Sequence, residues 1–190
     1  MKSYINNLAK EILNIEQNGL SKVRFAKILY FVHKGLILEN LVKSEDMKFI
    51  RMPLGPVPVG FKKLSEDSDI AVETKLSSLT YNTEIYKLIN YTESFERLYK
   101  ETIKRILNDL RMFPTSELIK ISHHEPSWNK LTNGSEYFIS GDDLRENLPK
   151  RTSSHKLSSE IDEQRIQARL VEGMINDIVE ESTLLEYPVN

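Results

Sequence analysis

The sequence predicts a mainly α protein with a small antiparallel β-sheet, an α+β arrangement in which a compact helical domain precedes a C-terminal helical extension. Three observations predict this fold class. Apolar residues recur at helical spacing in the longer segments. Two short segments, 69–76 and 83–89, instead combine β-branched and aromatic residues around a turn, as a hairpin does. A stretch rich in proline and glycine, RMPLGPVPVGF at 51–61, interrupts the helical pattern.

Two helices are predicted at the N-terminus. Ser3 can cap a helix that runs to about Gln17, and the Asn-Gly pair after it ends the helical pattern. Ser21 can cap a second helix over 22–40. Apolar residues cover most of the surface of this second helix, which predicts a central, buried position.

The segment around the proline-rich stretch predicts a strand followed by a helix. Residues 46–52 alternate in the manner of a short strand. Val57, Phe61 and Leu64 then fall at i, i+4 and i+7, which predicts a short helix with Gly55 outside its start.

Three further helical segments follow the predicted hairpin. Thr92 can cap an amphipathic helix that Pro114 ends. Thr115 or Ser116 can cap the next helix, and the segment 140–148 predicts one more helical turn.

The chain is predicted to divide into a domain at 1–148, a polar linker at 149–156 and a C-terminal helical extension at 157–190. Within the extension, 157–182 reads as one amphipathic helix. Its two apolar columns hold Ile166, Leu170, Met174 and Ile178, and Val171, Ile175 and Val179.

Composition excludes several classes of function. The chain has 26 lysines and arginines against 28 acids, so it lacks the positive field that drives binding to nucleic acid, and nucleic acid is not an expected partner. With no cysteine, it can form neither a disulfide nor a zinc–thiolate site. No apolar run is long enough to cross a bilayer, and no secretion signal is visible, so we expect a cytoplasmic protein without a membrane partner.

The proline-rich stretch is a poor anion-binding loop. A phosphate cradle needs converging backbone N–H groups, and Pro53, Pro56 and Pro58 each remove one. The stretch instead favours a stiff connection, which loses little entropy when a partner docks on it.

A second unusual stretch, HHEPSW at 123–128, brings His123, His124 and Glu125 together in sequence. Two histidines one helical turn apart around a glutamate would indicate a zinc site, but these histidines are adjacent and point in different directions. A helix C-terminus that the imidazoles cap is the favoured interpretation. The lone Trp128 favours a core anchor over an interface residue. No catalytic motif appears, so we expect neither an enzyme nor a cofactor.

Three stretches, taken in order, resemble one known family. KVRFAKILYFVHKGLI at 22–37 is similar to the buried helix of the Panacea domain, the SocA-type antitoxin domain. MPLGPVPVGFKKL at 52–64 resembles the YGPV motif of that family and the helix after it, and LIKISHHEPSWNKL at 118–131 resembles its LSHxExPW segment. The resemblance covers roughly residues 5 to 131.

The resemblance implies a function without a reaction. Members of the family are antitoxins of bacterial and phage toxin–antitoxin pairs, or proteins linked to mobile elements, and they neutralise a toxic partner protein by direct contact. No catalytic residues carry over. The expected partner is therefore a cognate toxin protein, and whether the chain also forms a homo-oligomer stays open.

The two motif loops are the predicted contact surface, and we expect them to lie side by side with Trp128 near Pro56 or Pro58. The predicted partner-binding residues are Gly55, Pro56, Val57, Pro58, Phe61, His124, Glu125 and Trp128.

Four alternatives stay open on the sequence alone. The amphipathic segment at 157–182 is a competing contact surface for the toxin. A DNA-binding autorepressor would use Lys150, Arg151 and Lys156, and a metal-dependent enzyme would use the His-His-Glu run. An adaptor that delivers a partner to a protease is the fourth.

Overall fold

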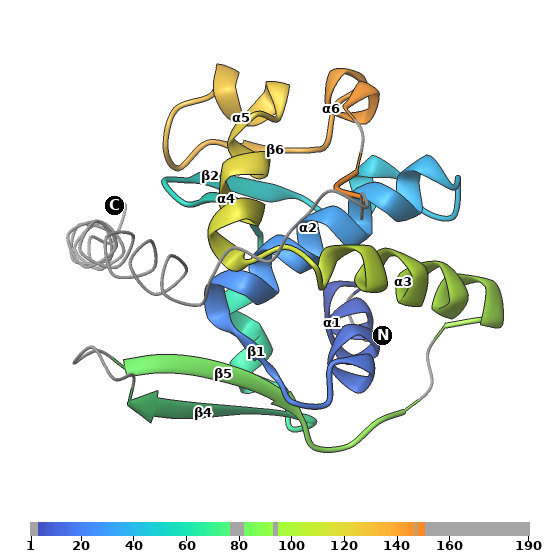
Figure 1. Cartoon of the computed structure of the whole chain (residues 1–190), viewed down its shortest axis with the longest axis vertical. Helices are drawn as coiled ribbons and strands as arrows, with labels where there is room; N and C mark the ends of the chain where they lie inside the picture. The colour runs from blue at the N-terminus through green and yellow to red at the C-terminus, as the bar shows by residue number, and fades with distance from the viewer. Residues whose placement is uncertain (1–3, 77–81, 93–94, 147, 151–190) are drawn as a thin grey trace, which may run out of the picture. The chain divides into compact units, whose positions relative to one another are not determined.

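The computed structural model describes residues 4–76, 82–92, 95–146 and 148–150 (Figure 1). The chain divides into two units, Met1–Thr152 and Ser153–Asn190. The second unit lies outside the described residues, and so do most of the predicted linker and the predicted helix at 157–182. The extension therefore stays a prediction, and the described helices and strands all belong to the first unit.

Helix α2, Lys22–Leu38, lies at the centre of the first unit, as its apolar surface predicts (Figure 1). Most of its side chains are buried, and it packs against helices and strands on several sides. Ser21 is its N-cap residue, as predicted, although its side chain makes no capping hydrogen bond. The helices around it are α1 (Tyr4–Ile15), α3 (Arg97–Leu110), α4 (Thr115–His123), α5 (Pro126–Lys130) and α6 (Gly141–Arg145), with short 3-10 helices η1 (Ser44–Asp46) and η2 (Phe61–Glu66).

Two antiparallel sheets flank this central helix. One has the strand order β1-β5-β4 and the other the order β3-β2-β6. The strands of the first sheet are β1 (Leu20–Ser21), β4 (Ile70–Leu76) and β5 (Asn82–Leu88). Those of the second are β2 (Phe49–Met52), β3 (Gly55–Pro58) and β6 (Glu136–Tyr137). The β4–β5 pairing confirms the predicted hairpin.

The predicted fold class, mainly α with one small sheet, is therefore wrong. The described residues form an α+β mix with two three-stranded antiparallel sheets. The prolines of β3 hid the second sheet from the sequence prediction. Val59 donates its backbone N–H to the carbonyl oxygen of Lys48, so these two residues form a hydrogen-bonded pair. Hydrogen-bonded and non-hydrogen-bonded pairs alternate along the strand, so Pro56 and Pro58 fall at non-hydrogen-bonded positions. Their backbone nitrogens therefore face the open edge of β3. Proline is tolerated at such positions because no ladder hydrogen bond is lost.

Several predicted helix boundaries also change. Val57 lies on β3, so the helix expected to contain it is only the 3-10 turn η2. Helix α3 begins at Arg97, well after the predicted cap Thr92, and its N-cap residue is Glu96. Pro114, rather than Thr115 or Ser116, is the N-cap residue of α4. The predicted turn near 140–148 is confirmed as α6, capped by the side chain of Ser140.

The core joins the helices to both sheets through aromatic rings. Phe25 and Phe61 connect α2 to η2, and Tyr30 and Phe49 connect α2 to β2. Within the described part of the chain, no helix combines the length and the apolar character that crossing a membrane requires.

His33 lies in this core as a fully buried histidine. Its Nδ1 atom is 3.1 Å from the hydroxyl of Tyr4, and its Nε2 atom has no hydrogen-bond partner among the described residues. Burial lowers the pKa of His33 to about 4. The backbone of Ser44 and the charge of Asp46 raise this pKa, but by less than burial lowers it. The folded protein therefore holds this imidazole in its neutral form.

We expect His33 to make the protein less stable in mild acid. The unfolded chain takes up a proton below about pH 6.5, whereas the folded chain does so only near pH 4, so stability is lost as the pH falls between these values. Between pH 7 and pH 5, His33 is expected to lower the free energy of unfolding by about 2 kcal/mol. Urea unfolding of the wild type and of His33→Gln at both pH values measures it. An equal loss of stability in both proteins would contradict this role of His33.

Candidate functional site

The first predicted motif forms a tight hairpin that is locked into the protein at Gly55. Strands β2 and β3 pair from Phe49–Pro58 to Met52–Gly55. Gly55 has a φ of +95°, and a Cβ atom built on it would lie 2.2 Å from the Ser122 Oγ and 3.0 Å from the Lys27 Nζ. Only glycine suits both this backbone angle and this close approach. The hairpin therefore packs directly against α2 and α4.

Lys27 reaches the hairpin from the central helix. Its side chain is buried, and its Nζ atom donates to the carbonyl oxygen of Pro56 at 2.8 Å. Burial lowers the pKa of Lys27 well below its usual value. The nitrogen and the carbonyl oxygen of Pro56 both face away from β2, because in an antiparallel strand the two groups of one residue point to the same side. No neighbouring strand donates to this oxygen, and Lys27 supplies the hydrogen bond instead.

The second motif meets the hairpin through Trp128 on α5. The indole Nε1 donates to the carbonyl oxygen of Met52 at 3.0 Å, and the guanidinium of Arg51 lies 3.8 Å from the centre of the indole ring. The ring of His123 stacks on the same indole, with a centroid distance of 4.0 Å and an angle of 10°. The two motif loops thus lie together, joined by the contacts of Trp128 with Met52 and Arg51 on β2, while the expected approach of Trp128 to Pro56 or Pro58 stays a prediction.

The two histidines have different surroundings. His123 is half-buried, and burial lowers its pKa, with Lys27 and Arg51 adding to the effect. His124 is exposed at the C-terminus of α4. Among the described residues, no three His, Asp or Glu side chains gather in a way that could hold a metal ion.

Glu125 is the buried N-cap residue of α5. Its two carboxylate oxygens lie 2.8 and 2.9 Å from the Nζ atom of Lys34, and both side chains are almost completely buried. Burial raises the pKa of Glu125, and the neighbouring Lys34 opposes that rise. The pair fixes the start of α5, and with it Trp128, to the central helix.

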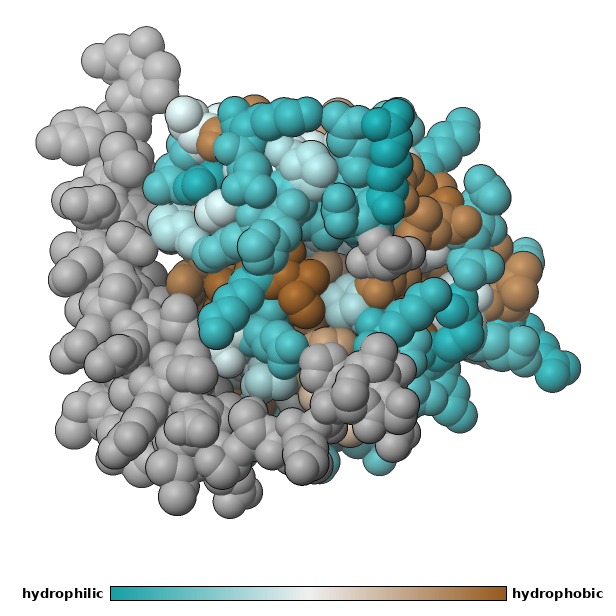
Figure 2. All heavy atoms as spheres, turned by 45° about the horizontal axis from the view of Figure 1, so that its top comes forward, coloured by the Kyte–Doolittle hydropathy of each residue, from teal (hydrophilic) through white to brown (hydrophobic). Residues whose placement is uncertain are grey.

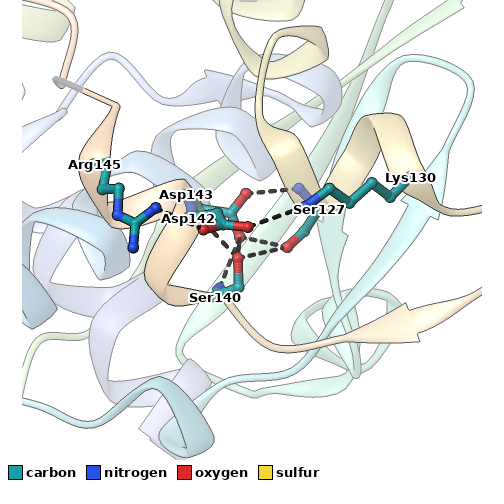
Figure 3. Close-up of polar contacts among 6 residues, drawn as sticks. All are labelled: Ser127, Lys130, Ser140, Asp142, Asp143 and Arg145. Atoms are coloured by element: carbon teal, nitrogen blue, oxygen red, sulfur yellow. Dashed lines mark hydrogen bonds and ion pairs between the residues drawn. The ribbon is translucent and has the colours of Figure 1, made fainter.

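Asp143 attaches α6 to the second motif (Figure 3). Its buried carboxylate accepts hydrogen bonds from the backbone N–H groups of Ser127 and Ser140, at 2.8 and 2.7 Å, and from both serine hydroxyls. The neighbouring Asp142 points outward to Lys130 and Arg145. One aspartate thus holds α5 and α6 together, while its neighbour makes only surface ion pairs.

The two aspartates form a matched pair for mutagenesis. Asp143→Asn removes the charge that four donors share and turns an N–H group toward them, so we expect a loss of about 2–3 kcal/mol in the free energy of unfolding. Asp142→Asn removes only exposed ion pairs, and we expect no measurable change. Chemical denaturation measures both. Similar effects in the two variants would contradict the role assigned to Asp143.

The structure brings most of the predicted contact residues together and separates one. Gly55, Pro56 and Pro58 lie on β3, close to the α4–α5 corner that carries the second motif. Phe61 instead packs in the core against Phe25 and Tyr86, with centroid distances of 5.6 and 5.4 Å. The buried members of the predicted set are Gly55, Pro56, Pro58, Phe61, Glu125 and Trp128. Val57 is half-buried and His124 is exposed.

Sequence reasoning missed the side chains that hold the two motifs in place, namely Lys27, Lys34, Arg51, Ser122 and Asp143. A signal was present for the first two. They are seven residues apart, two turns along a helix that is otherwise apolar on nearly all sides, and a charged residue in such a helix needs a buried partner.

The face that carries α5, β6 and α6 is mostly hydrophilic, with apolar side chains gathered between the polar ones (Figure 2). Val59, directly after β3, and Phe138, directly after β6, are exposed apolar residues at 37% and 39%. The hairpin and the adjoining face of α5, β6 and α6 thus offer a mixed polar and apolar surface, which suits recognition of a protein.

One family of proteins matches this chain. The family model for the antitoxin SocA-like Panacea domain matches residues 25–129, which include most of α2, the whole hairpin and nearly all of the α4–α5 corner. Neither a curated protein nor a solved structure matches the chain. The matched residues make up more than half of the 190-residue chain, and the protein belongs to the SocA-like antitoxin family of Panacea domains.

Proposed function

We propose that this protein is an antitoxin that neutralises a cognate toxin protein by forming a direct complex with it, without catalysing a reaction. The observation that carries the proposal is the family match, which covers both motif loops and most of the central helix α2, against which both loops pack. The proposal includes the phage or mobile-element association and the cytoplasmic location expected from the sequence.

The packing of the motifs supports binding with little rearrangement. Gly55 fits against α2 and α4, Trp128 is bonded to Met52, and Glu125 is paired with Lys34. A surface whose backbone is fixed in advance loses little conformational entropy when a partner docks. The hairpin and the α4–α5 corner, which we call the motif surface, are therefore suited to hold a partner tightly.

The predicted partner-binding residues divide into two roles within this proposal. The exposed His124 and the half-buried Val57 contact the toxin. The buried members, Gly55, Pro56, Pro58, Phe61, Glu125 and Trp128, act through the shape of the surface.

Growth rescue tests the function. The gene next to the one for this chain is expressed alone and together with this chain in a bacterial host. We expect growth arrest from the neighbour alone, normal growth from the pair, and a stable complex on co-purification. Arrest that this chain does not relieve would contradict the proposal.

Substitutions on the motif surface test the assigned contacts. We expect His124→Glu and Val57→Lys each to weaken the complex about tenfold or more, because each places a charge where a partner packs. The matched control is Lys104→Glu on α3, a helix that packs on α1 and α2. Binding to the arresting protein and thermal unfolding are measured for all three. Unchanged affinity in the two motif variants would place the toxin contact elsewhere.

A further inference from the structure

Strand β4 is the one long sheet edge in the described part of the chain that carries no proline. Edge strands expose unpaired N–H and C=O groups, and proteins protect them with prolines, short length or charges. Strands β1 and β6 have two residues each, and β3 carries two prolines. Strand β4 has seven residues and pairs with β5 on one side only (Figure 1).

The hydrogen-bond pattern shows which residues face this open edge. Ile89 donates its backbone N–H to Asp69 across the hairpin at 2.8 Å. Hydrogen-bonded pairs therefore alternate from that point in the register, so Ala71, Glu73 and Lys75 bond to β5. The backbone groups of the even-numbered residues Val72 and Thr74 consequently point to the open edge.

A second copy of this chain fits the open edge through antiparallel pairing, as a two-fold axis requires. Because only the even-numbered residues of β4 point their backbone groups to the open edge, only they can form hydrogen-bonded pairs with the second copy across the two-fold axis. A register centred on Glu73 or Lys75 places like charges opposite each other, which is destabilising. A register centred on Val72 needs the N–H of Ile70, which already bonds to Asp67 at 2.9 Å.

The register centred on Thr74 meets both conditions within the described strand. Thr74 then faces Thr74 of the second copy in a hydrogen-bonded pair. Glu73 faces Lys75 of the second copy, and Lys75 faces Glu73, in the pairs where side chains approach most closely. The side chains of all three residues are exposed. Glu73 already bonds to Lys87 at 2.7 Å, so Lys75 of the second copy would add a second cation to that carboxylate.

We propose that the protein forms a symmetric homodimer in which β4 strands of two copies pair about Thr74 and join two three-stranded sheets into one sheet of six. This proposal does not depend on the antitoxin function. Only the seven residues of β4 in each copy can pair, so the dimer forms reversibly and its population rises with protein concentration.

Sedimentation velocity over a wide concentration range, from about 5 to about 500 µM, tests the dimer with a variant that alters only the open edge. In Thr74→Pro the lost N–H is one that β5 does not use, so the monomer keeps its fold. We expect the wild type to shift to the dimer as its concentration rises and Thr74→Pro to remain monomeric, with the same circular dichroism. A wild type that is monomeric throughout, or a Thr74→Pro that dimerises equally, overturns the proposal.

Charge reversal tests the register. Glu73→Lys and Lys75→Glu each place like charges opposite each other in a homodimer, so we expect each alone to be monomeric. Mixed together they place opposite charges at both contacts, and we expect a heterodimer in native mass spectrometry. A monomeric mixture, or homodimers of the single variants, overturns the register. If the wild type is monomeric and Thr74→Pro no longer binds the growth-arresting protein, then β4 binds the toxin, and the dimer proposal is overturned.

Discussion

Replacing Lys34 by alanine is expected to lower the free energy of unfolding by about 3–5 kcal/mol. Glu125 accepts two hydrogen bonds from the Lys34 Nζ atom in a site that is almost closed to solvent. Without Lys34, its carboxylate either remains charged and unpaired or takes up a proton. The start of α5 then loses its attachment to α2, so Trp128 shifts. Urea unfolding at pH 7 measures the stability loss.

The control for Lys34 lies on the same helix. Lys22 pairs with Glu84 at 2.8 Å, but both side chains are about half exposed, so we expect Lys22→Ala to cost about 1 kcal/mol or less. The double variant Lys34→Met with Glu125→Leu removes both buried charges together and should recover most of the stability lost in Lys34→Ala. Equal effects of the Lys34 and Lys22 substitutions would contradict the importance of the buried pair.

Replacing Gly55 by alanine is expected to cost about 3–4 kcal/mol, from backbone strain and overlap together. The new Cβ atom would lie 2.2 Å from the Ser122 Oγ. The hairpin must then move away from α4, so we also expect the variant to lose rescue of growth. Thermal and chemical unfolding, together with the growth assay, measure both effects.

Gly60 is a matched control for Gly55. Its φ is +87°, close to the +95° of Gly55, but a Cβ atom there would meet nothing within 4 Å. Gly60→Ala therefore measures the backbone strain alone, about 1 kcal/mol. Ser122→Ala removes the nearest clashing atom, so its combination with Gly55→Ala should cost less than the sum of the two. Equal losses for the two glycine variants would show that packing at Gly55 is not tight.

The parts of the fold that the sequence predicts are those with a long, uninterrupted pattern. Helix α2 and the β4–β5 hairpin have such patterns and are confirmed. Strand β3 was missed because its prolines read as a break, although they occupy positions that need no N–H. Strands β1 and β6 have two residues each, too few for any periodicity to appear.

The candidate site shows the same division. The motifs identified two loops that the structure brings together, and the sequence predicts this adjacency from the proline, aromatic and histidine residues that both loops combine. Which of those residues are buried depends on contacts between distant segments. Lys34 and Glu125 are 91 residues apart, and Ser127 and Asp143 are 16 apart. Local periodicity carries no information about such pairs, because only the folded chain brings them together.

The most direct test of the central claim is hydrogen–deuterium exchange, measured on the chain alone and on its complex with the toxin identified in the growth assay. The claim is that the motif surface binds the toxin with its backbone already in place. We predict that amides within 53–60 and 123–130 become more protected in the complex, with little change in the buried helix α2. Protection confined to other segments, such as α3 or residues 153–190, would contradict the claim.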